Sequence, residues 1–247
     1  EKLSNHTSQK IDIVVIRFPK ISNYTDFLPL ERLSEVSVRY VSDVSSIGSP
    51  DLIIHPGTKN TLADLRWLKN TGIAEFLKAK KGQIPILGIC GGYQMLGENI
   101  SDPFGIEEGG TEEGLGLIPM TTVMEKIKTT RQVEGSLENG GFVRGYEIHC
   151  GSSHFSKDVR PLISSSSEGI IDERNLVAGT YWHGFFDETA PVQALMDFIF
   201  ERKGMAPKQL SEMSQRESTN AELDRLADIL EANLDMNFLD SLISTGL

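Results

Sequence analysis

The sequence has little cysteine, no long apolar run and no block of positive charge. Its two cysteines, Cys90 and Cys150, are too few for a disulfide framework. No stretch approaches the roughly 18 apolar residues of a membrane span or resembles a signal peptide. The formal net charge of −11 argues against a nucleic-acid or anionic-membrane partner, because phosphate groups are bound by clustered Lys and Arg. We therefore expect a cytoplasmic protein with no nucleic-acid and no membrane partner, whose acidic charge serves solubility.

The remaining composition is that of an ordinary globular chain. Its 247 residues, 39% of them hydrophobic, suit one large domain or one domain with an appendage. The chain begins at Glu1 rather than Met, which suggests a processed product or an excised part of a longer protein. We expect residues 1–10 to be a linker or disordered, 11–204 to form the main domain, and 205–247 to hold a linker and an amphipathic helix.

That final helix is expected to start at the capping-box pattern Thr219-x-x-Glu222 and to carry its leucines on one face. The leucines are Leu223, Leu226, Leu230 and Leu234. Such a face packs either on the main domain or on another domain or subunit, and the sequence leaves both open.

Strand-length apolar runs alternate with helix-forming segments in the first hundred residues, which predicts a doubly wound, mostly parallel α/β sheet flanked by helices. The expected strands are Ile11–Ile16, Val36–Val41 and Asp51–Ile54, and the expected helices are Phe27–Glu35 and Leu62–Lys69. A Thr61-x-x-Asp64 capping box opens the second helix, and the sequence leaves open whether that helix continues to Lys81. After Gly97, shorter strands broken by Gly-rich and acidic stretches indicate a smaller antiparallel layer. A strand over Leu176–Trp182 and a helix from about Val192 to Lys203 follow.

Cys90 stands in the run Gly88-Ile89-Cys90-Gly91-Gly92-Tyr93-Gln94, directly after the apolar segment 84–87. This pattern is typical of a nucleophile on a sharp turn between a strand and a helix, where glycines permit the bend and keep neighbouring elements clear. The helix N-terminus at such a turn favours the thiolate. The alternative is a buried structural cysteine beside a glycine turn.

Polar residues follow three of the predicted strands, and sites in open parallel sheets lie beyond the carboxyl ends of the strands. These residues are His55–Asn60, Cys90 and His183. Histidine is the usual base that activates a thiolate, so we predict a Cys90–His183 dyad, with the backbone N–H groups of Gly57 and Gly91 as an oxyanion hole. A structural histidine at 183 and a plain turn glycine at 57 are the alternatives.

Five motifs occur in order along residues 11–204. They are Ile21-Ser22-Asn23-Tyr24-Thr25-Asp26-Phe27, Pro56-Gly57-Thr58-Lys59-Asn60-Thr61 with Asp64-Leu65, Gly88-Ile89-Cys90-Gly91-Gly92-Tyr93-Gln94-Met95-Leu96, Gly145-Tyr146-Glu147-Ile148-His149, and Gly179-Thr180-Tyr181-Trp182-His183-Gly184-Phe185-Phe186-Asp187. Together they resemble the triad-type glutamine amidotransferases, and within them the branch that amidates corrins. The resemblance implies a class I glutamine amidotransferase-like, flavodoxin-like fold.

The same resemblance implies that Cys90 attacks the side-chain amide of glutamine, while His183 protonates the departing ammonia and then activates water to hydrolyse the glutamyl thioester. It also implies that Gln94 and the backbone from His149 to Gly151 help to hold the glutamine. Gln94 could instead be a surface residue of the helix after Cys90, and His149 a structural histidine at a strand end.

No metal site is expected. His149, Cys150 and His154 lie close together in the sequence but lack any established ligand spacing.

Most triad amidotransferases carry a glutamate two residues beyond the histidine, and this chain has Phe185 there. The corrin-amidating branch commonly lacks that glutamate. We therefore expect a dyad or a substitute acid, with Asp187, Glu188 or a carboxylate from a partner domain as candidates.

The sequence also lacks the G-x-x-x-x-G-K-[ST] phosphate loop, so no cofactor is expected in this chain. The resemblance implies a separate N-terminal synthetase domain that binds ATP and Mg²⁺ and uses the ammonia to amidate a corrin substrate. A glutaminase that serves another acceptor, such as lipid II, and a non-catalytic regulatory domain of the same fold are the alternatives.

Overall fold

The computed structural model describes residues 11–164, 166, 168–210 and 215–245. Its main sheet has the strand order β2-β1-β3-β4-β10-β9, parallel except for β9, so the predicted doubly wound, mostly parallel sheet is confirmed. The strands are β1 (Ile11–Ile16), β2 (Val36–Val41), β3 (Leu52–His55), β4 (Ile86–Ile89), β9 (Gly169–Asp172) and β10 (Val177–Thr180). Every residue of β3 and β4 is buried, as expected for central strands covered on both faces.

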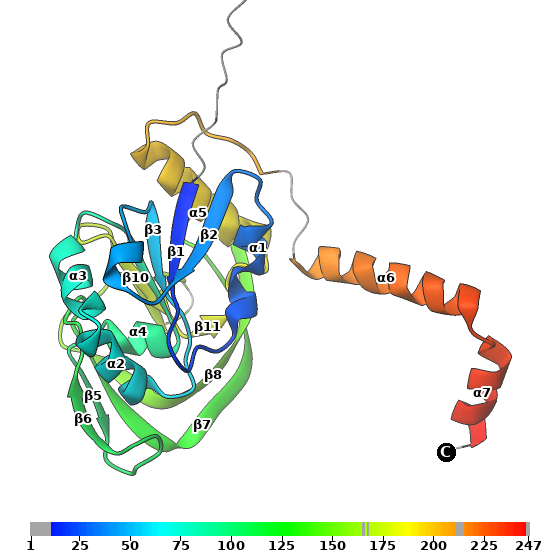
Figure 1. Cartoon of the computed structure of the whole chain (residues 1–247), viewed down its shortest axis with the longest axis horizontal. Helices are drawn as coiled ribbons and strands as arrows, with labels where there is room; N and C mark the ends of the chain where they lie inside the picture. The colour runs from blue at the N-terminus through cyan, green and yellow to red at the C-terminus, as the bar shows by residue number, and fades with distance from the viewer. Residues whose placement is uncertain (1–10, 165, 167, 211–214, 246–247) are drawn as a thin grey trace, which may run out of the picture.

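A second sheet, in the order β11-β8-β7-β5-β6, forms the expected smaller layer, antiparallel except between β5 and β7. Its strands are β5 (Asn99–Asp102), β6 (Gly110–Glu113), β7 (Met120–Ser136), β8 (Phe142–Phe155) and β11 (Trp182–His183). The expectation of short strands was wrong for β7 and β8, which have 17 and 14 residues and make the long curved hairpin in Figure 1. The Gly-rich stretch at 138–141 separates the two strands, as expected, and forms the turn of this hairpin.

The helices around the main sheet are α1 (Leu28–Glu31), α2 (Thr61–Asn70), α3 (Ile73–Lys80), α4 (Gly91–Met95) and α5 (Thr189–Arg202), with 3-10 turns η1 (Tyr24–Phe27) and η2 (Val44–Ser46). The helix expected over Phe27–Glu35 is shorter, because η1 precedes a single turn of α1. The helix expected over Leu62–Lys69 is present as α2, and the extension toward Lys81, which was left open, is a separate helix, α3, that begins after Gly72 with its φ of 76°.

The cap of α2 also differs from the expectation. Asn60 is the N-cap residue, and its Oδ1 accepts a hydrogen bond from the Ala63 N–H at 2.9 Å. The Asp64 carboxylate accepts from the Thr58 hydroxyl and from the Lys20 N–H, so the Thr61 capping box was wrong.

The strand expected over Leu176–Trp182 is broken at Tyr181. The Trp182 N–H donates to the Thr180 hydroxyl at 3.1 Å, and the chain passes there from β10 in the main sheet to β11 in the second sheet. His183 therefore lies where the two sheets meet.

Two further helices, α6 (Gln215–Asn233) and α7 (Met236–Thr245), project away from the α/β body (Figure 1). The helix starts before the expected Thr219, and the α6 side chains whose exposure is described are all exposed. Residues 1–10, expected to be a linker, lie outside the described residues. No helix in the described part of the chain combines the length and apolar character needed to cross a membrane.

Candidate active site

The turn expected around Cys90 is present between β4 and α4. Cys90 adopts φ 53° and ψ −114°, a combination that non-glycine residues rarely adopt and that is typical of a nucleophile elbow. A Cβ atom at Gly88 would lie 2.6 Å from Cα of Tyr93, and one at Gly92 would lie 2.2 Å from the carbonyl oxygen of His55. Glycine at these two positions therefore lets β4, α4 and the end of β3 approach closely enough to form the elbow.

The strand order brings the three predicted polar segments together, because β3 and β10 flank β4 on either side. The Cys90 N–H donates to the Thr180 carbonyl at 2.9 Å, which ties the elbow to the end of β10. The Cys90 thiol lies 3.7 Å from the Ile148 carbonyl oxygen on β8, and Cys90 and His183 line the same cavity. Cys90 and His183 are thus neighbours.

His183 is held by a carboxylate from the other end of the chain. Its Nδ1 lies 2.7 Å from Oδ2 of Asp26, a residue of η1 that is 157 positions away in the sequence. The Gly184 N–H donates to Oδ1 of the same carboxylate at 3.0 Å. Tyr146 stacks on the His183 ring, with centroids 5.3 Å apart, and its hydroxyl accepts from Asn23 at 3.2 Å. The result is a Cys90–His183–Asp26 arrangement in which His183 and Asp26 are almost fully buried.

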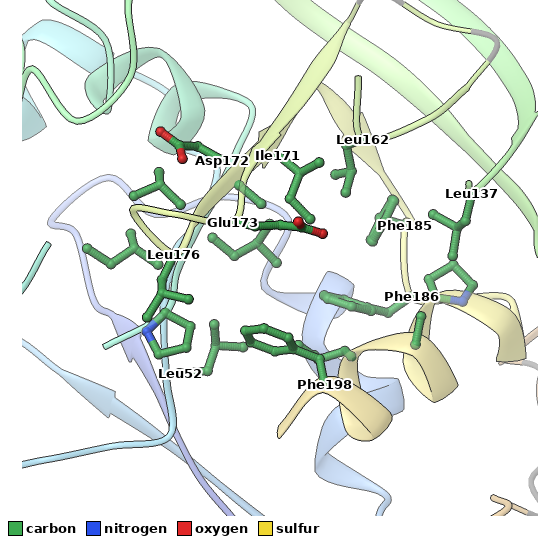
Figure 2. A pocket seen from close by; sticks show the side chains of 18 residues that line it. Leu52, Leu137, Leu162, Ile171, Asp172, Glu173, Leu176, Phe185, Phe186 and Phe198 are labelled. Atoms are coloured by element: carbon green, nitrogen blue, oxygen red, sulfur yellow. The ribbon is translucent and has the colours of Figure 1, made fainter. Parts of the chain in front are cut away.

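A substitute acid was one of the two expectations, and the structure places the carboxylate of Asp26 beside His183, in place of the candidates Asp187 and Glu188. The position two residues after His183 faces away from the site: Phe185 lines an apolar cavity of about 300 Å³ together with Phe186 and Phe198 (Figure 2). A carboxylate placed among these rings would lose its hydration, which strongly disfavours its charged form.

Asp26 lies in one of the five motifs, but no spacing rule connected it to His183. Tyr146 lies in another of these motifs, and its stacking on His183 likewise depends on the fold. The sequence signals for Asp26 were its place in the first motif and its position just before the apolar segment 27–30.

The hydrogen bonds of His183 favour its protonated form. Burial lowers the pKa of His183, but the hydrogen bonds and negative charges of Asp26 and Cys90 together outweigh burial and raise it to about 10. An imidazolium beside Cys90 stabilises a thiolate and is ready to protonate a leaving group.

A cavity of about 270 Å³ opens onto Cys90, a size that suits an amino acid. Besides Cys90, it is lined by Ser22, Asn23, Thr58, Lys59, Thr61, Gly91, Gln94, Glu107, Lys128, Ile148, His149, Cys150 and His183. The cavity thus contains a thiol, an imidazole and charged groups of both signs.

Gln94 and His149, both predicted to contact substrate, line this cavity and also hold its wall together. The Gln94 amide donates to the Cys150 carbonyl at 3.0 Å and to the Tyr181 hydroxyl at 3.3 Å, and it accepts from Thr61 at 3.2 Å. Gln94 is only 2% exposed, so it is not a surface residue of α4. The His149 ring stacks on Tyr181 with centroids 3.9 Å apart.

The three predicted glycines occupy different places. Gly91 lines the cavity, and as the first residue of α4 its N–H has no acceptor within the helix. Two other described glycines, Gly57 and Gly151, are not among the lining residues. Gly57 lies against the His183 ring, since a Cβ atom there would be 2.9 Å from Cε1 of His183, and the Gly151 carbonyl oxygen lies 3.2 Å from Nδ1 of His149.

Comparison with known proteins agrees with this geometry. The sequence profile of the CobB/CobQ-like glutamine amidotransferase domain matches residues 12–191. The cobyric acid synthase of Lachnoclostridium phytofermentans is 40% identical, with 100% of this chain and 53% of the relative aligned. The probable cobyric acid synthase of Methanosarcina barkeri is 43% identical, over 96% of this chain and 49% of the relative. The chain therefore spans about half the length of the curated relatives it matches.

Solved structures show the same fold. A crystal structure of a glutamine amidotransferase superimposes with a TM-score of 0.57 at 15% identity, covering 78% of this chain and 99% of that chain. The structure of PurLQS from Thermotoga maritima gives a TM-score of 0.56 at 18% identity, covering 77% and 99%. The class I glutamine amidotransferase-like fold is thereby confirmed. With its profile match and its relatives near 40% identity, the chain belongs to the CobB/CobQ-like glutamine amidotransferase domain family.

Proposed function

We propose that this chain is the glutaminase domain of a cobyric acid synthase, in which Cys90 hydrolyses glutamine to supply ammonia. The observation that carries the proposal is the Cys90–His183–Asp26 arrangement at the elbow, open to a cavity of amino-acid size. The similarity to cobyric acid synthases along the whole chain supports a corrin as the final acceptor. The greater length of those relatives supports a further domain, which would bind ATP and Mg²⁺ and activate the corrin carboxylates.

In the first half of the reaction, the Cys90 thiolate attacks Cδ of the glutamine side-chain amide. The negative charge that develops on the amide oxygen is stabilised by the Gly91 N–H, with the Gly57 N–H as the second donor. The C–N bond then breaks, and the imidazolium of His183 gives its proton to the departing ammonia.

In the second half, His183 is neutral and takes a proton from a water molecule that attacks the glutamyl thioester. The C–S bond breaks, which releases glutamate and restores the thiolate beside the imidazolium. Asp26 keeps the ring in one orientation through both halves and stabilises its charged form.

Replacing the nucleophile tests this assignment. In the full-length synthase, Cys90→Ala should abolish glutamine-dependent amidation while preserving amidation supplied with an ammonium salt, because only the source of ammonia is lost. A glutamine-analogue electrophile should modify the unsubstituted protein at Cys90, as located by peptide mass spectrometry. Normal glutamine turnover in Cys90→Ala would exclude this nucleophile, and an unmodified Cys90 in the intact enzyme would favour a non-catalytic domain.

The acceptor requires a separate test. Full-length enzyme supplied with glutamine, ATP and Mg²⁺ should amidate adenosylcobyrinic acid a,c-diamide. Amidation of cobyrinic acid or of lipid II instead would move the protein to a related amidotransferase.

A further inference from the structure

The walls of the Cys90 cavity carry charges of opposite sign. Glu107, in the loop between β5 and β6, contributes a carboxylate, and Lys128, on β7, contributes an ammonium group. We propose that Glu107 binds the α-ammonium group of glutamine and that Lys128 binds its α-carboxylate, so that the two residues select the free amino acid. This inference rests on the proposed glutaminase function and names the residues that recognise its substrate.

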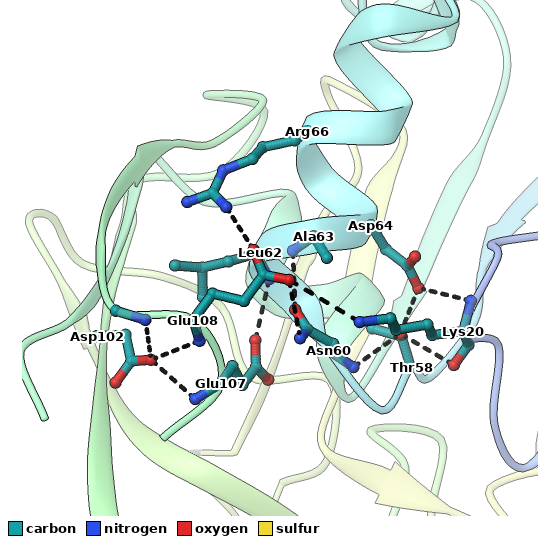
Figure 3. A network of polar contacts seen from close by, with 11 residues as sticks. Lys20, Thr58, Asn60, Leu62, Ala63, Asp64, Arg66, Asp102, Glu107 and Glu108 are labelled. Carbon is teal, nitrogen blue, oxygen red and sulfur yellow. Dashed lines mark hydrogen bonds and ion pairs between the residues drawn. The ribbon is translucent and has the colours of Figure 1, made fainter. Parts of the chain in front are cut away.

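Glu107 is held in place by a loop built around a buried carboxylate. Asp102, only 1% exposed, accepts hydrogen bonds from successive N–H groups of the loop (Figure 3). The donors are Ile106, Glu107, Glu108 and Gly109, at 2.8, 2.9, 3.2 and 2.9 Å. This loop sets the Glu107 carboxylate against the start of α2, where it accepts from the Leu62 N–H at 3.0 Å. Glu107 is therefore a fixed anion at the cavity and not a freely moving surface side chain.

Lys128 reaches the cavity because of an irregularity in β7. The pairing of β7 with β8 is interrupted between Val123 and Lys128, where β7 carries extra residues that bulge out of the ladder. Pairing resumes with Lys128 opposite Cys150, so both side chains point to the same face, and both line the cavity. Lys126, on the bulge, differs: its ammonium group lies over the Phe104 ring, 5.0 Å from the centroid, and is not among the lining groups in the described residues.

The two charges also act on one thiol in the cavity. Burial raises the pKa of Cys150, Lys128 lowers it and Glu107 raises it, which indicates that both charged groups lie within electrostatic range of this side chain. Burial likewise raises the pKa of Glu107 in spite of the N–H donors at the start of α2, so a cationic ligand would favour its ionised form. Lys59 lines the cavity too, and we assign the carboxylate to Lys128 because its place opposite Cys150 in the ladder fixes it on the cavity face of β7.

This arrangement matches the chemistry of glutamine. The reacting amide lies at one end of glutamine, and the ammonium and carboxylate groups lie at the other. The cavity offers Cys90 for the amide, and Glu107 and Lys128 for the two charged groups. Within a peptide, a glutaminyl residue has neither charge. Such a site therefore rejects peptide-bound glutamine by leaving both charged side chains without partners.

The test uses two amides that each lack one charge of glutamine. Glutaric acid monoamide has no ammonium group, and 4-aminobutanamide has no carboxylate. In the intact enzyme, Glu107→Gln and Lys128→Met should each raise KM for glutamine about 10- to 100-fold with little change in kcat, the scale of a lost charge-assisted hydrogen bond. Glu107→Gln should leave kcat/KM for glutaric acid monoamide unchanged, and Lys128→Met should leave that for 4-aminobutanamide unchanged.

Matched controls come from neighbouring residues. Glu108→Gln and Lys126→Met remove the same charges outside the cavity, and KM should stay within about twofold. Glu107→Gln retains an amide oxygen that accepts from the Leu62 N–H, and thermal melting will show whether each variant is folded. If each variant affects both analogues and glutamine equally, the residues have only a structural role and the proposal is wrong. A KM effect at Lys59→Met but not at Lys128→Met would overturn the assignment of Lys128.

Failure of this inference can be distinguished from failure of the proposed function. Glutamine binding is measured by calorimetry in Cys90→Ser, which cannot turn the substrate over by the proposed route. If the enzyme does not hydrolyse glutamine but the Glu107 and Lys128 substitutions weaken its binding, the recognition pair holds and the reaction is wrong. If the enzyme hydrolyses glutamine and neither substitution changes its binding, the pair is wrong and the reaction holds.

Discussion

Asp26 defines the chemistry of His183 at the level of a single residue. Because its carboxylate engages Nδ1 at 2.7 Å, the other ring nitrogen is the one available to Cys90. The additional hydrogen bond from the Gly184 N–H fixes the carboxylate itself at 3.0 Å. The orientation of the His183 ring is therefore set by a side chain that lies outside the strand carrying His183.

Replacing Asp26 by Asn should reduce kcat for glutamine hydrolysis by about 10²- to 10⁴-fold with little change in KM, because an amide does not stabilise the imidazolium. The control is Asp187→Asn, which removes a carboxylate that the sequence alone made a candidate and which should retain kcat. Steady-state measurements of glutamate release check both. A large loss in Asp187→Asn together with normal turnover in Asp26→Asn would contradict the assignment.

The raised pKa of His183 also makes stability depend on pH. The folded protein binds this proton more tightly than the unfolded chain does, with a pKa of about 10 against a usual value of 6.5. The resulting stabilisation is complete below about pH 6.5 and is lost as the pH rises through 10. We expect the free energy of unfolding, measured by denaturant titration between pH 6.5 and 10, to fall more steeply in the unsubstituted protein than in Asp26→Asn. Parallel curves would show that the pair does not hold the proton.

Among the elements, those that form from local pattern were predicted and those that depend on distant pairing were not. The runs at 11–16 and 36–41 are strands with the expected bounds, because apolar β-branched residues favour a buried pleated strand. The lengths of β7 and β8 were missed because each is stabilised mainly by the other, and many of their outward residues are polar. The same holds for Asp26, which joins His183 only through tertiary structure.

Gly92 in α4 tests whether the elbow requires α4 to lie this close to the end of β3. Gly92→Ala would place a Cβ atom 2.2 Å from the His55 carbonyl oxygen, so α4 must shift relative to β3. We expect a loss of about 1–3 kcal/mol or more in the free energy of unfolding, together with loss of glutamine hydrolysis. The comparison variant is Gly48→Ala, where φ is 69° but no atom lies within 4 Å, and which should cost about 1–2 kcal/mol with normal activity. Full activity in Gly92→Ala would show that the elbow tolerates displacement.

For the whole molecule, the main structural division lies between the α/β body and the C-terminal helices. The body extends at least to Leu210, whose N–H donates to the Gln193 side chain on α5 at 2.8 Å. Beyond it, α6 exposes Leu223 and Leu226, which are 57% and 50% exposed, and Glu222 on α6 forms an ion pair of 3.5 Å with Arg32 of the body.

Ending the chain after Leu210 should therefore leave the body intact. The thermal unfolding midpoint should stay within about 2 °C of that of the full chain, because exposed ion pairs contribute little stability. Calorimetry on the two proteins checks this. A drop of more than about 5 °C would mean that the helices dock on the body in solution, which was one of the two outcomes left open by the sequence.

The origin of the Asp26 carboxylate bears on how related sequences are judged. A search for inactive amidotransferases commonly asks whether an acid follows the histidine, and here that position is Phe185, packed in an apolar cavity. By that criterion this chain would be classed as a degenerate enzyme. The acid is supplied instead by the segment after β1, so sequences with an apolar residue at the equivalent of Phe185 should be inspected near the beginning of the domain before they are counted as pseudoenzymes.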